Sequence, residues 1–87
     1  MEIIYSKRSL KFLSKLDRKS AEKILRAIEG LTHTPAEGDI KPMQGYKIGT
    51  KRLRTGSWRI IFRIDDNGQV RILYVIDIGN RGDIYKK

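Results

Sequence analysis

The chain of 87 residues contains no cysteine, only two prolines and no long apolar run. The absence of cysteine excludes a disulfide framework and a thiolate metal site. The longest apolar run, residues 72–76, is far shorter than the ~20 residues that a membrane-spanning helix needs. Residues 1–5 lack the basic and apolar segments of a secretory signal peptide. We therefore expect a single domain over residues 1–87, located in the cytoplasm and without a cofactor.

Acidic residues are missing from a long internal part of the chain. No Asp or Glu lies between Asp39 and Asp65, and 19 Lys and Arg against 10 Asp and Glu give the chain a net charge of +9. Clustered cations displace counterions from a phosphate backbone, so this distribution favours a nucleic acid or an acidic protein as partner. The alternative is a basic surface without a partner. The cations of this acid-free part are Lys41, Lys47, Lys51, Arg52, Arg54, Arg59 and Arg63.

The most strongly patterned part of the chain is residues 57–85, where apolar and basic side chains alternate. Period-two alternation predicts two β-strands joined by a turn at Asp66-Asn67-Gly68. We favour a three-residue loop with Gly68 in the left-handed conformation over a two-residue Asn-Gly turn, because the former makes one face wholly apolar. This register predicts the pairs Trp58/Ile76, Ile60/Tyr74, Phe62/Ile72 and Ile64/Val70.

Two amphipathic helices are predicted to follow a short strand over residues 2–5. Ser6 and Asp17 are suitable N-cap residues. The apolar residues behind each cap recur at helical spacing, which predicts an αα-hairpin that covers the apolar face of the sheet. The two stripes are Leu10, Leu13 and Leu16, and Ala21, Ile24, Leu25, Ile28 and Leu31.

The segment between the helices and the hairpin contains both prolines. Residues 30–42 are predicted to be a connection, and residues 44–55 a strand that is broken near Gly49-Thr50. A tight turn at Thr55-Gly56 pairs Leu53 with Trp58 and Arg52 with Arg59. The predicted fold class is therefore α+β: an N-terminal strand, an αα-hairpin and a three-stranded antiparallel meander, with the helices packed on one face of the sheet.

The predicted register collects arginines on the other face of the sheet. Like charges that lie directly opposite each other cost roughly 0.2–1 kcal/mol per pair, so such a cluster favours a site for an anion. We expect a phosphate site where Arg52, Arg59 and Arg81 converge, and solvated side chains for Arg63 and Arg71. The full predicted set is Arg52, Arg54, Arg59, Arg63, Arg71 and Arg81.

The order of the elements, with GSWRIIFRI near the middle and VIDIGNRGDIYK at the end, resembles the RelE/ParE toxin superfamily over nearly the whole chain. The Gly-x-x-Arg and Gly-x-Arg-x-x-x-Tyr motifs, with Tyr46-Lys47-Ile48, are similar to the RelE branch. This resemblance implies a toxin of a type II toxin–antitoxin system that cleaves messenger RNA on the ribosome. It also implies inhibition by a cognate antitoxin, which we expect to be small and acidic or amphipathic. The ParE branch, which inhibits DNA gyrase without cleavage, is the alternative, and a nucleic-acid-binding domain without catalysis is a weaker one.

The resemblance also implies site residues. Arg59 and Arg81 match the two catalytic arginines, Tyr85 the C-terminal tyrosine, and Lys47 and Arg52 the two lysines of the basic strand. Arginine does not act as a base at neutral pH, so the general base is left open. Asn80 replaces the histidine or lysine often found before the second arginine. The further cations expected to bind RNA are Lys51, Arg54 and Arg63.

The chemistry that such a site supports is restricted, because the sequence offers neither a metal-ligand cluster nor a cysteine nucleophile. RNA carries its own nucleophile, the 2′-hydroxyl, so we expect cleavage without a metal ion. His33, the single histidine, has no predicted catalytic role.

Overall fold

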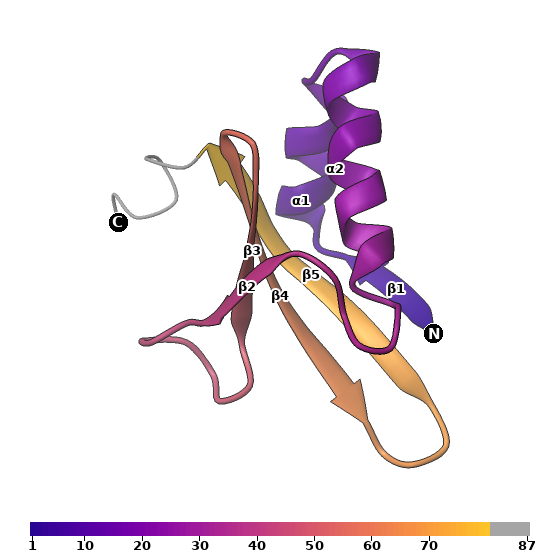
Figure 1. Cartoon of the computed structure of the whole chain (residues 1–87). Coiled ribbons are helices and arrows are strands. Elements are labelled where there is room, and N and C mark those ends of the chain that lie inside the picture. Colours follow the sequence, from indigo (N-terminus) through magenta and orange to yellow (C-terminus); the bar gives the residue numbers. More distant parts are fainter. Residues whose placement is uncertain (81–87) are drawn as a thin grey trace.

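The computed structural model describes residues 1–80, which form two helices and five strands (Figure 1). The sheet order is β1-β5-β4-β3-β2; β1 is parallel to β5, and the other neighbours are antiparallel. The predicted α+β class, N-terminal strand and helical hairpin are confirmed, whereas the sheet is mixed and contains one strand, β2, that was not predicted. Along the chain the elements are β1 (Glu2–Tyr5), α1 (Lys7–Ser14), α2 (Arg18–Gly30), β2 (Asp39–Pro42), β3 (Lys51–Thr55), β4 (Trp58–Asp66) and β5 (Arg71–Asn80).

Both helices begin at the predicted caps. The side chain of Ser6 accepts a hydrogen bond from the Ser9 backbone N–H, and that of Asp17 accepts one from the Ser20 backbone N–H. These bonds satisfy donors that the first turn of a helix leaves without a partner. Hydrogen bonding by Ser20 holds the pKa of Asp17 below its ordinary value.

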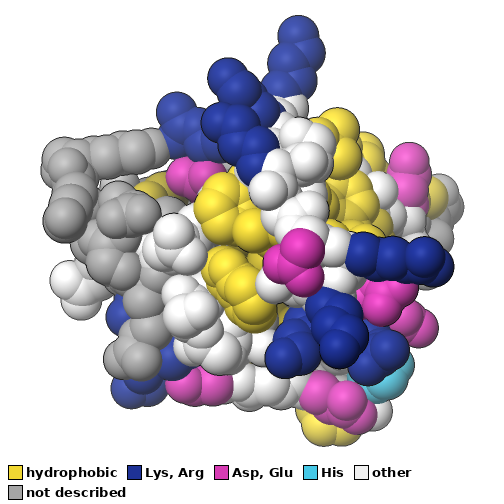
Figure 2. Space-filling view, turned by 90° about the horizontal axis from the view of Figure 1, so that it is seen from above, with side chains coloured by type: hydrophobic (Ala, Val, Ile, Leu, Met, Phe, Trp, Pro, Cys, Tyr) yellow, Lys and Arg dark blue, Asp and Glu magenta, His cyan; other side chains and the backbone are white. Residues whose placement is uncertain are grey.

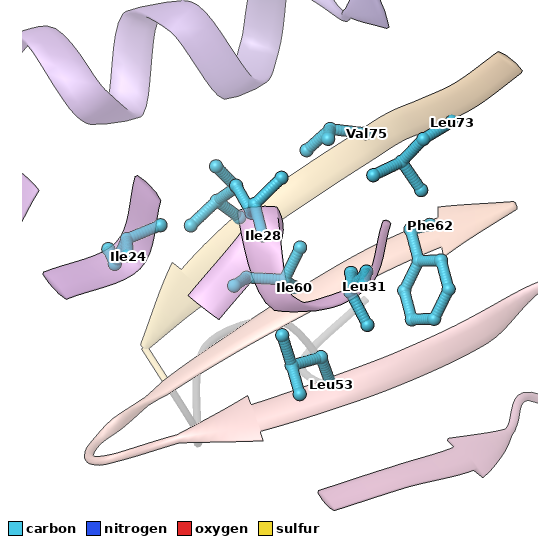
Figure 3. Packing of buried hydrophobic residues seen from close by; sticks show 9 residues of the cluster. Ile24, Ile28, Leu31, Leu53, Ile60, Phe62, Leu73 and Val75 are labelled. Carbon is cyan, nitrogen blue, oxygen red and sulfur yellow. The ribbon is translucent and has the colours of Figure 1, made fainter. Parts of the chain in front are cut away.

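The hydrophobic core lies between α2 and the sheet (Figure 3). Ile24, Ile28 and Leu31 are fully buried, as predicted, but Leu25 and Leu10 are 41% and 52% exposed. α1 turns Ser9 toward the sheet, where the Ser9 hydroxyl donates to the Val75 carbonyl. Consecutive helical residues differ by about 100° in direction, so Leu10, next to Ser9, points away from the sheet. The sheet side of the core consists of Leu53, Ile60, Phe62, Leu73, Val75 and Ile78.

The register of β4 against β5 differs from the prediction. Asp66 pairs with Arg71, and a β-bulge leaves Ile76 as an extra residue between the pairs Ile61/Asp77 and Phe62/Val75. The loop is wider than expected because the Asn67 side chain accepts hydrogen bonds from two backbone N–H groups across it. The prediction of a left-handed Gly68 is confirmed, with φ +88°. The shifted pairing places Leu73, Val75 and Ile78 in the core, so the prediction that Tyr74 and Ile76 face the helices is wrong.

The region before β4 also differs from its prediction. Part of the predicted connection is a strand, β2, while the predicted strand over residues 44–55 is strand only from Lys51 onward. The β3–β4 turn is at Gly56-Ser57, so Leu53 pairs with Ile60 and Arg54 with Arg59. Residues 43–50 form a loop that extends away from the helices (Figure 1). Gly45 and Gly49, with φ +81° and +91°, adopt there a conformation that side chains with a Cβ atom disfavour.

Neither helix of residues 1–80 is long and apolar enough to cross a membrane.

Candidate nucleic-acid interface

One face of the sheet is turned away from α1 and α2. Alternation along the strands and the observed register place on it Arg52 and Arg54 of β3, Arg59, Ile61 and Arg63 of β4, and Asp77 of β5. We call these six residues and their neighbours on the same side of the sheet the open face, within which Ile61, Arg52 and Asp77 are buried, with exposures of 0%, 5% and 8%. Arg52, Arg54, Arg59 and Arg63 therefore share a face as predicted, although the pairs between them differ.

Arg54 and Arg59 lie directly opposite each other on neighbouring strands. Opposed residues of an antiparallel pair have Cβ atoms about 4.5–5.5 Å apart. Both side chains are half-buried and their Nε atoms are buried, so part of each guanidinium group is removed from water. On the other side of Arg59, the β5 position is Gly79, which carries no side chain. Two cations are thus held close together at the end of the sheet nearest the C-terminus.

Arg52 has a different environment. Its side chain is 6% exposed, and Nη1 donates to the Asp39 carbonyl oxygen at 2.9 Å and lies 3.4 Å from the Asp39 carboxylate. Asp39 belongs to β2, so this contact ties the edge strand to β3. The guanidinium group of Arg52 is therefore part of the sheet's own structure.

Arg63 is also held by neighbours. Its Nε lies 3.1 Å from an Asp65 carboxylate oxygen, and its guanidinium carbon is 5.2 Å from the centroid of the Tyr74 ring. This geometry is a cation–π contact. A Cβ atom at Gly49 would lie 3.9 Å from the Arg63 Cγ, so the loop of residues 43–50 approaches this side chain closely. With only 19% of the side chain exposed, Arg63 is not the solvated residue that the sequence predicted.

Arg71 lies outside the open face. Because it pairs with Asp66, it shares the helix side of the sheet with Leu73 and Val75. Its Nε is 3.3 Å from an Asp66 carboxylate oxygen. The predicted membership of Arg71 in the basic face is wrong, since it depended on the three-residue turn.

The sequence did not predict the role of Asp77. This carboxylate is 8% exposed, lies beside Ile61 in the register, and is 3.2 Å from Nη1 of Arg8 in α1. The sequence did carry a signal for this role, namely an acidic residue inside the otherwise apolar run of β5. Next to it, the Ser6 hydroxyl donates to the Ile76 carbonyl at 2.8 Å, which covers the edge of β5 where β1 ends.

The two lysines proposed for the site lie away from the Arg54–Arg59 pair. Lys51 is opposite Phe62, on the helix side of the sheet. Lys47 lies in the exposed loop whose Gly49 adjoins Arg63, and Arg63 is four residues, or about 13 Å, along β4 from Arg59. The structure therefore brings together Arg52, Arg54 and Arg59, but not Lys47 or Lys51. Arg81 and Tyr85 lie outside the described residues.

In Figure 2, Lys and Arg side chains form separate groups with Asp and Glu between them. Within residues 1–80, no group of three or more His, Cys, Asp or Glu side chains could hold a metal ion.

The fold is an αα-hairpin on a mixed sheet with an arginine-bearing open face. The family described as ParE toxin of type II toxin-antitoxin system, parDE, matches residues 3–85, and the chain belongs to it. No curated protein sequence matches the chain.

Solved structures agree in fold and carry the names of both branches. A YoeB/ParE toxin from Agrobacterium tumefaciens is 26% identical with a TM-score of 0.76, and the match covers 92% of this chain and 98% of that one. The toxin–antitoxin complex RelBE2 from Mycobacterium tuberculosis gives 20% identity, a TM-score of 0.72, and coverage of 92% and 96%. The RelB-RelE complex from Methanococcus jannaschii gives 26% identity, a TM-score of 0.63, and 94% coverage of both chains. The chain is thus a toxin of the type II class, and its activity is a separate question.

Proposed function

We propose that this toxin cleaves messenger RNA without a metal ion, most effectively when the message is bound to a ribosome. The observation that carries the proposal is the opposition of Arg54 and Arg59 on the open face. Two half-buried guanidinium groups directly opposite each other concentrate positive charge and hydrogen-bond donors at one place, where a phosphate group binds both. Charge that develops on a phosphate during cleavage is stabilised more strongly in such a partly desolvated place than in water.

The reaction that fits these residues is attack by the RNA 2′-hydroxyl on the adjacent phosphate. A bond from O2′ to phosphorus forms and the bond from phosphorus to O5′ breaks, which leaves a 2′,3′-cyclic phosphate and a free 5′-hydroxyl. Arg59, with Arg81, contacts the non-bridging oxygens and stabilises the charge of the transition state. Tyr85 takes the proton of the 2′-hydroxyl through its phenolate oxygen, or it stacks on a base while water takes that proton. In both cases O5′ takes a proton from water as it leaves.

For the other predicted residues we propose roles that do not include contact with the cleaved phosphate. Arg52, held by Asp39, positions β3 and β2 and thereby Arg54. Lys47, in the loop that adjoins Arg63, binds RNA away from the cleaved bond. Arg63 packs beneath that loop, and Lys51 lies on the other side of the sheet.

Primer extension on cellular messages after induced expression tests this function. Wild type should produce new 5′ ends within coding regions, whereas Arg59→Ala at the same expression level should reduce them by about 10²–10³-fold, the scale for loss of one preorganised donor. Intact messages together with arrested DNA replication would contradict the proposal.

The second candidate is inhibition of DNA gyrase without cleavage, as the ParE name of the matching family suggests. Ion pairs also favour it, because Asp39, Asp65 and Asp77 neutralise cations at or beside the open face. Supercoiling of relaxed plasmid by purified gyrase separates the two functions. Inhibition by both wild type and Arg59→Ala would support the second candidate.

We also propose that a cognate antitoxin covers the open face, since similar folds have been solved as toxin–antitoxin complexes. A chain with a net charge of +9 attracts acidic segments. Association should therefore slow as salt is added, which stopped-flow mixing measures directly.

A further inference from the structure

The loop of residues 43–50 exposes large side chains at its tip. Tyr46 is 42% exposed and Ile48 is 95% exposed, and Lys47 lies between them. An aliphatic side chain so fully exposed contributes nothing to the packing of the core. These three residues form the tip of what we call the projecting loop, residues 43–50.

The base of the projecting loop is well anchored. The Met43 backbone N–H donates to the Thr50 carbonyl at 3.0 Å, and the Thr50 N–H donates to the Lys47 carbonyl at 3.0 Å. Thr50 itself is buried, and Gly49 lies against the aliphatic part of Arg63. A fixed base presents the apolar tip in a defined direction, which lowers the entropic cost of binding through it.

The chemical surroundings of the tip favour an anionic partner. No acid occurs in residues 40–64, and Lys41, Lys47 and Lys51 are exposed on or beside the loop. A partner that suits a phenol ring and an aliphatic group flanked by lysines has both apolar surface and negative charge. A single-stranded nucleic acid has both, since each nucleotide carries a stacking face and a phosphate.

We infer that the projecting loop binds an unpaired nucleotide of the RNA a short distance from the cleaved bond. Tyr46 stacks on the base, Ile48 packs against the neighbouring base or ribose, and Lys47 contacts a phosphate. This inference rests on the proposed RNA cleavage and extends it, because the loop lies beside Arg63, about 13 Å along β4 from Arg59. The substrate strand then follows the open face from the Arg54–Arg59 pair to the loop.

The test uses the full-length chain made by cell-free synthesis and a single-stranded RNA that carries 2-aminopurine, whose fluorescence falls on stacking. Base stacking on an aromatic ring contributes about 1–3 kcal/mol per base, so Tyr46→Ala should weaken binding by about 5- to 150-fold. The slope of log affinity against log salt should stay unchanged. Tyr46→Phe keeps the ring and should retain both affinity and fluorescence quenching.

Matched variants separate stacking from charge. Lys47→Ala should reduce the salt slope by about one, as expected for one lost phosphate contact, while quenching persists. Ile48→Ala should give a smaller loss than Tyr46→Ala. Leu10→Ala, which removes an exposed aliphatic side chain from α1, should leave binding unchanged.

The outcomes distinguish this inference from the proposed function. If wild type binds and cleaves RNA but Tyr46→Ala and Ile48→Ala bind the probe like wild type, the inference fails and the function stands. If those variants instead lose only antitoxin binding, the loop is a protein-docking element and the inference is again overturned. If wild type neither binds the probe nor cleaves RNA, both fail, whereas Arg59→Ala that quenches normally but does not cleave supports both.

Discussion

Four arginines share the open face, but they are held in two different ways. Arg52 and Arg63 each contact an acidic partner, Asp39 and Asp65, whereas Arg54 and Arg59 are placed opposite each other. Cations neutralised by the protein's own acids hold strands and loops in position. Arg54 and Arg59 bring two positive charges together, and Asp39 lies opposite Arg54 on its other side. The net charge of a basic chain therefore does not by itself identify its binding residues.

The largest expected effect concerns Arg81, the residue that follows β5 in the chain. Arg81→Ala should lower the rate of cleavage by about 10²–10³-fold, because one donor to the transition state is lost. Affinity for RNA should fall much less, since many other cations contribute to it. Single-turnover cleavage and filter binding measure the two effects separately, and equal losses in both would assign Arg81 to binding alone.

Stability should distinguish the two kinds of arginine. Arg52→Ala removes the donor to the Asp39 carbonyl and should lower the free energy of unfolding by about 1–3 kcal/mol. Arg54→Ala removes a like charge from opposite Arg59 and should change it by less than about 1 kcal/mol in either direction. Urea unfolding of both variants provides the comparison, and equal losses would remove the distinction.

A smaller effect is expected where Arg63 stacks on Tyr74. Tyr74→Leu keeps an apolar side chain but removes the ring, and should cost about 0.5–1 kcal/mol of stability. Tyr74→Phe keeps the ring and serves as the matched control. A Leu variant as stable as the Phe variant in thermal unfolding would show that the contact contributes nothing.

The smallest effect lies far from the open face, at the cap of α2. Because Ser20 lowers the pKa of Asp17 in the folded chain, the ionised carboxylate stabilises the fold at neutral pH. This contribution is fully present above the unfolded value near 3.8 and is lost as pH falls through the lower folded value. Asp17→Asn should remove that part of the acid dependence of the unfolding midpoint. RNA cleavage at neutral pH should stay unchanged, and a loss of cleavage would show that α2 takes part in the site.

Local patterns predicted the elements better than they predicted how the elements pair. Ser6 and Asp17 were recognised because a cap depends on a few neighbouring residues. The β4–β5 register was mispredicted because the Asn67 side chain closes a wider loop and a bulge absorbs Ile76. β2 was missed because its four residues become a strand only by pairing with β3.

For the candidate site, too, the sequence predicted which face the arginines occupy better than it predicted their neighbours. The predicted and observed β3–β4 pairings differ by two residues, and a shift of two keeps Arg52, Arg54 and Arg59 on one face. Asp39 contacts Arg52 and lies opposite Arg54 because β2 pairs with β3, and the sequence did not predict that pairing. Arg71 was predicted to lie on the open face only because of the three-residue turn, and the observed pairing places it on the other face.

The central claim is that Arg59 acts on the phosphate and not on the fold. Single-turnover cleavage of a ribosome-bound message by Arg59→Ala, with urea unfolding of the same preparation, tests it directly. We predict a rate about 10²–10³-fold below that of wild type, with an unfolding midpoint close to that of wild type. An unchanged rate, or a rate that falls only in proportion to the folded fraction, would contradict the claim.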